Sequence, residues 1–271
     1  MGVLEGPRKE VRRVMKGGSA YWVEFRDGRI VFADGRTCDE SEVVHLPPCS
    51  PTKILCVHVN YISRYYEFNN TRVPPRTPTY FQKPLTALNA HKGELVKPEG
   101  YTYVNYEGEM AVVFGKVTKN VTREEAWDCI AGFAPANDFG CHDFRDTDSG
   151  SMLRVKGMDG FCPIGPGLVS GVDVRQSTLR SYKNGKMVQE GAVSEQIFDC
   201  GYLIADLARH ISNTRQRVRW FQRRQNALKF RTQFEGLKRF GVRSAEILSA
   251  AYVGQVRMFR PNAGIVQARA D

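Results

Sequence analysis

Residues 106–115, with the sequence YEGEMAVVFG, combine an apolar strand with two acidic side chains. The run of Ala, Val and Phe, closed by Gly115, predicts a β-strand. Because side chains alternate between the faces of a strand, Glu107 and Glu109 share one face, with their carboxylates roughly 7 Å apart. Two like charges beside an apolar run are costly unless something neutralises them. The segment is therefore either part of a site for a hard divalent cation, with Mg²⁺ as the first candidate, or an exposed strand start with two solvated glutamates.

A third carboxylate favours the metal hypothesis. Asp138 follows the apolar stretch 130–134 and has small and apolar neighbours, which is unusual for a solvated aspartate. Two strand glutamates and one aspartate would hold Mg²⁺ and leave positions open for substrate and water. Between them, the sequence TREE at 122–125 predicts a capping box that opens a helix through about Ala131. The carboxylates are thus expected from a strand and from the segment after the next helix.

Composition limits the class of protein. The 271 residues suffice for a sizeable core and one or two domains, and 42% of them are hydrophobic, which is ordinary for a globular chain. No apolar run approaches the length of a membrane-spanning helix, and the first residues lack the apolar region of a secretory leader, so we expect neither. The seven cysteines are scattered without a C-x-x-C pair. This pattern favours free thiols in a reducing compartment, and hence a cytoplasmic protein.

The net charge of +10 comes from one end of the chain. Residues 1–210 contain 26 Lys and Arg and 26 Asp and Glu, whereas residues 211–271 contain 13 basic and 3 acidic side chains. The excess marks a break in composition rather than a basic protein as a whole.

Local patterns predict three parts: a small β unit at 1–50, a metal-dependent catalytic core at 51–210 and an atypical basic segment at 211–271. In the first part, strands at 20–25 and 29–32 flank an Asp-Gly turn. In the core we expect a buried strand at 53–59, a lid or binding loop at 68–84, a hairpin with an Asn-Gly turn at 182–188 and a helix at 201–210.

Six motifs in order resemble the fumarylacetoacetate hydrolase family, and within it the isomerase/decarboxylase branch of homoprotocatechuate (4-hydroxyphenylacetate) catabolism. The resemblance covers about residues 50–210. Its motifs are VNY at 59–61, FQKP at 81–84, YEGE at 106–109, AND at 136–138, KGMDGFCPIGP at 156–166 and SEQIF at 194–198.

The resemblance implies a mixed β or α+β fold, a β-roll with a small N-terminal β unit, and a homodimer. It also implies Mg²⁺ (or Mn²⁺) held by Glu107, Glu109 and Asp138, and a small-molecule substrate that is a 2-oxo or enol dicarboxylic acid. Chelation of such a substrate would stabilise an enolate. By position, Lys156 would contact the metal-bound end of the substrate and offset developing negative charge, the alternative being a surface lysine in a charged loop.

The segment predicted to cover the site departs from the family pattern. Many members have Asn-Tyr-x-x-His-x-x-Glu, where the His–Glu pair activates water. Here Asn60 and Tyr61, candidate substrate-binding residues, are followed by Arg64 in place of the histidine and by Glu67. Arginine cannot act as a base near neutral pH, but it can bind a carboxylate in bidentate fashion. We therefore assign Arg64 and Glu67 to a catalytic lid and favour decarboxylation or isomerisation, with acylpyruvate-type C–C hydrolysis as the alternative.

A second departure lies after the metal aspartate, where some hydrolases have an arginine and this chain has His142. Its two interpretations are a substrate-binding residue and a loop histidine with no role.

The third departure is the C-terminal segment. The family's Gly-Asp turn, Thr-Gly-Thr-Pro loop and closing strands do not follow His210; an Arg/Gln-rich stretch with Trp220 and Phe221 does. One interpretation is a polyanion-binding or membrane-binding extension on a catalytically impaired homologue, since aromatic residues among arginines can stack on bases. We favour a foreign or frame-shifted tail in which the closing strands are missing or altered, and we expect no nucleic-acid and no membrane partner.

Overall fold

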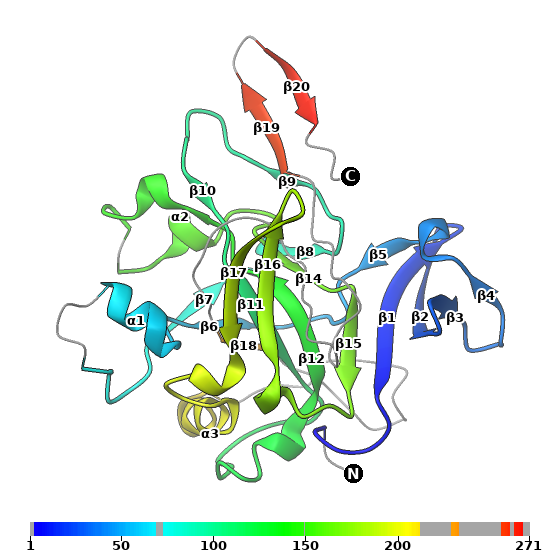
Figure 1. Cartoon of the computed structure of the whole chain (residues 1–271), viewed down its shortest axis with the longest axis horizontal. Helices are drawn as coiled ribbons and strands as arrows, with labels where there is room; N and C mark the ends of the chain where they lie inside the picture. The colour runs from blue at the N-terminus through cyan, green and yellow to red at the C-terminus, as the bar shows by residue number, and fades with distance from the viewer. Residues whose placement is uncertain are drawn as a thin grey trace.

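The computed structural model describes residues 3–68, 73–148 and 150–211, and the backbone of three strands at 229–232, 256–260 and 263–267. The side chains of Glu67 and Phe68 lie outside the described part. Within it, most of the regular structure is β, and a sheet of 13 strands forms the body of the molecule (Figure 1). The main path of this sheet runs through β4 (Thr37–Cys38), β3 (Arg29–Val31), β2 (Ser19–Arg26), β1 (Lys9–Lys16), β15 (Gly167–Ser170), β12 (Ile130–Asn137), β11 (Gly108–Phe114), β18 (Lys229–Thr232), β6 (Ile54–Val57) and β7 (Tyr80–Lys83).

Three further strands join this path at its sides, namely β5 (Val44–Leu46), β8 (Leu88–Ala90) and β14 (Cys162–Ile164). Smaller pairings are formed by β9 (Leu95–Val96), β10 (Val104–Asn105), β13 (Gly140–Cys141), β16 (Thr178–Lys183), β17 (Lys186–Ala192), β19 (Val256–Arg260) and β20 (Ala263–Gln267). The α-helices of the described residues are α1 (Ile62–Phe68), α2 (Leu153–Lys156) and α3 (Cys200–His210). This arrangement confirms the predicted mixed β or α+β class. No helix in the described ranges is long and apolar enough to cross a membrane.

The central pair, β11 and β12, is covered on both faces. Along β11, Met110 and Val112 belong to one apolar cluster and Ala111 and Val113 to another, so alternate side chains enter different cores. All seven residues of β11 are buried. This explains why the segment reads as a continuous apolar run instead of an alternating one.

Helix α3 closes one of these two cores. Asp199 caps the helix by accepting a hydrogen bond from the backbone N of Tyr202 at 2.8 Å. Leu203, Ile204 and Leu207 then pack into the cluster that contains Met110 and Val112. In Figure 1, α3 lies beside the end of the sheet, below the β16–β17 hairpin. The helix therefore forms because it can bury its apolar face against the sheet.

The N-terminal β unit has the predicted strands. β2 and β3 pair around Asp27 and Gly28, which both have positive φ. The unit has a small core of its own, which includes Val14, Val23 and Ile30. It also continues the main sheet, because β1 pairs antiparallel with β15. The three-part division of the chain stays a prediction.

The prediction of a helix after residue 122 is wrong. The capping box itself is present: the backbone N of Thr122 donates to Glu125 Oε2 at 2.9 Å, and the backbone N of Glu125 donates to Thr122 Oγ1 at 3.2 Å. Only turns and one 3₁₀ turn, η3 (Trp127–Cys129), follow it. From Ile130 on, the chain pairs with β11 as a buried central strand. A cap contributes about 1 kcal/mol, which the burial of a whole strand outweighs.

One strand of the basic C-terminal segment lies inside the sheet. β18 pairs antiparallel with β11 and parallel with β6, so its backbone separates these two strands. The strands β19 and β20 pair with each other, and β19 pairs with β9. The remainder of residues 212–271 lies outside the described residues. The prediction that the segment as a whole is poorly specified therefore stays a prediction.

Candidate metal centre

Sheet register brings the three predicted carboxylates together. Glu109 pairs with Ala136 across β11 and β12, and Gly108 with Asn137. Glu107 and Asp138 are next in line, and the backbone N of Asp138 donates to the carbonyl of Glu107 at 2.9 Å. The carboxylates share the face that carries Ala111 and Ala134 further along the same strands. One oxygen from each of the three lies within 4.8 Å of the others.

The backbone that carries the glutamates is held on both sides. The backbone N of Glu107 donates to Asn137 Oδ1 at 3.0 Å. From the β16–β17 hairpin, Gln189 accepts from the backbone N of Gly108 and donates to its carbonyl, each at 3.1 Å. These bonds fix the spacing of Glu107 and Glu109 without using their carboxylates. Such support is what a preorganised site requires.

Two buried lysines reach the carboxylates from other elements. Lys156, at the end of α2, contacts the carboxylate of Glu107, and its Nζ lies 3.3 Å from Asp138 Oδ2. Lys83, at the end of β7, contacts Asp138 and donates to the carbonyls of Phe139 at 3.1 Å and Phe161 at 2.9 Å. The side chain of Lys156 is 2% exposed, so the surface-lysine interpretation is wrong.

All three carboxylates are fully buried. The alternative of two solvated glutamates is therefore wrong. In formal charge, the three carboxylates exceed the two ammonium groups by one negative charge. Their oxygens are close enough for one small ion, and carboxylate oxygens are the ligands that Mg²⁺ and Mn²⁺ favour. The donor set fits such a cation.

Two histidines lie near this cluster. His142, in the 3₁₀ turn η4 (His142–Phe144), has its Nε2 3.7 Å from Glu107 Oε1, so the structure brings this predicted residue to the site. His58, which follows β6, was missed. Burial lowers its pKa below the ordinary value, and the Lys156 ammonium lowers it further, whereas Asp138 and Glu107 raise it. The resulting neutral imidazole can accept or donate a proton.

The residues before the predicted lid have firm structural partners. Asn60 is fully buried, and its Nδ2 donates to the carbonyl of Phe198 at 2.8 Å while its Oδ1 accepts from the backbone N of Phe198 at 3.0 Å. Tyr61 is buried and forms an isolated bridge with Gln196. Burial raises the pKa of Tyr61 above its ordinary value. Substrate contact by either residue stays a prediction.

Arg64 lies on α1 and is half-buried. The side chain of Glu67 is outside the described residues. Their assignment to a lid therefore stays a prediction.

Sequence reasoning also missed Lys83 and Gln189. Lys83 occupies the second buried position of β7, whose burial alternates from Phe81 to Lys83. A lysine at an inward strand position is the signal that marks it. Gln189 is buried on a short hairpin that has no such pattern in the sequence.

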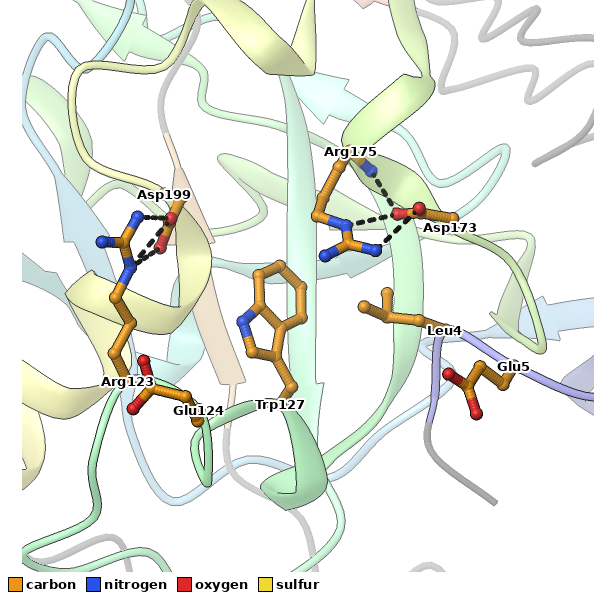
Figure 2. Close-up of a pocket in the computed structure, with 8 residues that line it drawn as sticks. All are labelled: Leu4, Glu5, Arg123, Glu124, Trp127, Asp173, Arg175 and Asp199. Atoms are coloured by element: carbon orange, nitrogen blue, oxygen red, sulfur yellow. Dashed lines mark hydrogen bonds and ion pairs between the residues drawn. The ribbon is translucent and has the colours of Figure 1, made fainter.

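A separate surface pocket lies beside the start of α3 (Figure 2). Its two arginines pair with aspartates of the same pocket: Arg123 with Asp199, and Arg175 with Asp173 through two bonds of 2.7 and 2.8 Å. Trp127 lies between the two pairs in this view. Arginines that already bind carboxylates offer little to an acidic ligand, so we do not place the active site here.

Comparison with known proteins identifies the part of the chain that contains this cluster. The sequence pattern described as "Fumarylacetoacetate (FAA) hydrolase C-terminal" matches residues 53–214, more than half of the chain. The chain belongs to this family. The matched segment contains all three carboxylates and both lysines.

Two of the following three relatives have names that describe an activity. A 4-hydroxyphenylacetate degradation bifunctional isomerase/decarboxylase of Salmonella dublin is 34% identical over 165 residues, which are 59% of this chain and 38% of that protein. The mitochondrial oxaloacetate tautomerase FAHD2A of Homo sapiens is 34% identical over 178 residues, which are 64% of this chain and 56% of that protein. An uncharacterized protein of Archaeoglobus fulgidus is 35% identical over 195 residues, 71% of this chain and 76% of its own length.

Solved structures support the fold. The 5-carboxymethyl-2-hydroxymuconate delta-isomerase of Mycobacterium smegmatis superposes with a TM-score of 0.76 at 24% identity, covering 93% of this chain and 100% of that one. A 2-hydroxyhepta-2,4-diene-1,7-dioate isomerase of Mycobacterium marinum gives 0.75 at 23% identity, with coverages of 92% and 98%. The fumarylacetoacetate hydrolase-like fold thus extends over most of the chain.

Proposed function

We propose that this protein is a Mg²⁺-dependent (or Mn²⁺-dependent) enzyme that decarboxylates or isomerises 2-oxo or enol dicarboxylic acids from the breakdown of aromatic compounds. The observation that carries the proposal is the buried cluster of Glu107, Glu109 and Asp138 on one face of β11 and β12. The bifunctional isomerase/decarboxylase relatives support the reaction class.

In this proposal the three carboxylates hold the cation. When bound, the cation polarises the ketone oxygen of the substrate and stabilises negative charge on it. Lys156, beside Glu107, would provide a second positive charge near that oxygen. Lys83 keeps Asp138 in place through its ion pair and its two carbonyl contacts.

The remaining groups would handle the rest of the substrate. His142 lies within reach of Glu107 at its Nε2 and would move a proton to or from the substrate carbon. Arg64 would bind the distal carboxylate, and Glu67 would complete the lid. An arginine at the position of the water-activating histidine favours decarboxylation and isomerisation over hydrolysis.

A second candidate is keto–enol isomerisation of a four-carbon 2-oxo dicarboxylate. The human relative named oxaloacetate tautomerase favours it. The chemistry overlaps with the first candidate, because both reactions pass a proton between an enol oxygen and a neighbouring carbon. They differ in whether a C–C bond breaks.

The test is a panel of 2-oxo acids assayed with and without Mg²⁺. Loss of enol absorbance without release of CO₂ identifies a tautomerase or isomerase, release of CO₂ identifies a decarboxylase, and release of two acids from an acylpyruvate identifies a hydrolase. Turnover that is unaffected by EDTA would contradict the metal-dependent proposal. Asp34→Asn, a change of an exposed residue in the N-terminal unit, serves as the control and should retain full turnover.

We also propose a homodimer in the cytoplasm. All seven cysteines are free and buried, which supports a reducing compartment. Light scattering of the purified protein tests the dimer.

A further inference from the structure

We propose a second metal site, formed by Glu40, His45 and His91, that binds a divalent transition metal, Zn²⁺ first, at the junction of the N-terminal strands and the core. It shares no residue with the carboxylate cluster and does not depend on the proposed function.

The three residues come from different elements. Glu40 begins the 3₁₀ turn η1 (Glu40–Glu42), His45 lies in β5 and His91 follows β8. β5 pairs with β1 of the N-terminal unit, whereas β8 pairs with β14 of the core. A metal at this point would therefore connect two parts of the chain that are distant in sequence.

The distances suit one ion. His45 Nε2 is 2.9 Å and His91 Nε2 is 3.8 Å from Glu40 Oε1, and one ligand atom from each residue lies within 4.8 Å of the others. Tetrahedral Zn²⁺ with bonds of about 2.0–2.2 Å holds its ligand atoms about 3.3 Å apart. The two separations from Glu40 lie on either side of this value.

The environment of His91 is the observation that points to a bound metal. The side chain of His91 is 2% exposed, its Nδ1 has no hydrogen-bond partner among the described residues, and its Nε2 faces Glu40 beyond hydrogen-bond distance. A buried ring nitrogen without a hydrogen-bond partner is costly, so the present contacts of His91 do not account for its position.

The local charges also admit a cation. Arg12 lies 2.9 Å from Glu40 Oε1, which at first sight opposes a metal. However, Arg12 also contacts Glu10 through its Nε and Nη2, each at 2.7 Å. Arg12, Glu10 and Glu40 together carry one negative charge. The exposed side chains of Arg8, 3.5 Å from Glu10, and of Lys92, which acts on Glu40, add positive charge that solvent screens. Glu40 is 31% exposed, so an ion can reach its carboxylate from solvent.

The ligand chemistry separates this site from the carboxylate cluster. Two imidazoles and one carboxylate favour Zn²⁺ and Co²⁺ over Mg²⁺, whereas three carboxylates favour Mg²⁺. Both sites can then be filled independently in one molecule.

The experiment uses the full chain without a polyhistidine tag, saturated with Mg²⁺, and titrates it with Co²⁺ and Zn²⁺. We expect about one Co²⁺ per chain with the strong visible absorption of a tetrahedral complex, displaced by Zn²⁺, and a rise in melting temperature with Zn²⁺. His91→Gln and Glu40→Gln should each lose the visible band and the thermal shift. Glu40→Gln alters a partly exposed side chain, so it remains informative if the buried histidine variant fails to fold.

Two controls locate the ion. His210→Gln changes an exposed histidine at the end of α3 and should leave the band unchanged. Asp138→Asn should also retain it, because that residue belongs to the other cluster. A band that disappears in Asp138→Asn, or one that persists in both His91→Gln and Glu40→Gln, would overturn the proposal, as would the absence of any Co²⁺ band in the parent protein.

Discussion

Lys83 and Asp138 form a fully buried ion pair between residues 55 positions apart in the sequence. The Nζ of Lys83 also donates to two backbone carbonyls, so all three of its protons have acceptors. The ammonium group of the lysine is therefore fully hydrogen-bonded at the edge of the carboxylate cluster. Its contacts join β7 to the loop that follows β12.

Lys83→Met should lower the free energy of unfolding by about 3–5 kcal/mol, because it removes one of the two ammonium groups that offset the buried carboxylate of Asp138. Urea denaturation in EDTA measures the change. Lys186→Met is the matched control, since Lys186 is exposed at the start of β17 and its loss should cost less than about 0.5 kcal/mol. A similar loss in both variants would mean that the buried pair has no special importance.

Asp138→Asn should abolish the stabilisation of the protein by Mg²⁺. The substitution keeps the volume of the side chain but removes one of the three charges that would attract the cation. Thermal melts at increasing Mg²⁺ should show a rise in melting temperature for the parent and none for the variant. Asp34→Asn changes an exposed aspartate and should respond like the parent. An undiminished Mg²⁺ response in Asp138→Asn would exclude this residue as a ligand.

Arg64→Ala should raise the KM for dicarboxylates by about 10- to 150-fold, which corresponds to about 1.5–3 kcal/mol for a charge-assisted hydrogen bond. The KM for monocarboxylates should change little, because they lack the group that Arg64 would bind. Arg64→Lys keeps the charge but loses the bidentate geometry, and should show an intermediate effect. Equal changes for both substrate classes would reject the carboxylate-binding role.

Asp143 should contribute to stability in a pH-dependent way. Desolvation alone would raise its pKa, but hydrogen bonds from Thr102 and from the backbone of Tyr103 lower the pKa to about 2. Because the folded-state pKa is below the ordinary value near 4, the contribution is fully present above about pH 4 and is lost as the pH falls toward 2. The difference in urea midpoint between the parent and Asp143→Asn should therefore shrink from pH 6 to pH 3. A difference that is constant across this range would contradict the assignment.

Local sequence patterns predicted those parts of the fold that depend on neighbours in the chain. The Asn184-Gly185 turn of the β16–β17 hairpin is an example, because both residues adopt the positive φ that such a turn requires. The shared face of Glu107 and Glu109 is another, since it follows from strand geometry alone.

Features that depend on distant segments were not predictable in this way. The capping box at Thr122 is present, yet the following residues form a strand because β11 offers a partner. Lys83 and His91 have no local pattern that reveals their partners, Asp138 and Glu40, which are far away in sequence. Their positions are set by sheet pairing rather than by propensity.

The carboxylate cluster and its surroundings have different origins in the fold. Glu107, Glu109 and Asp138 belong to two adjacent strands in the middle of the sheet, whereas His142 and Arg64 belong to connections between strands. Substitutions in these connections can reshape the space around a substrate without shifting the acidic oxygens. In such a scaffold, substrate preference can change through substitutions in the connections while the carboxylate cluster on the strands is kept. Related proteins can therefore evolve toward new substrates without rebuilding the cluster.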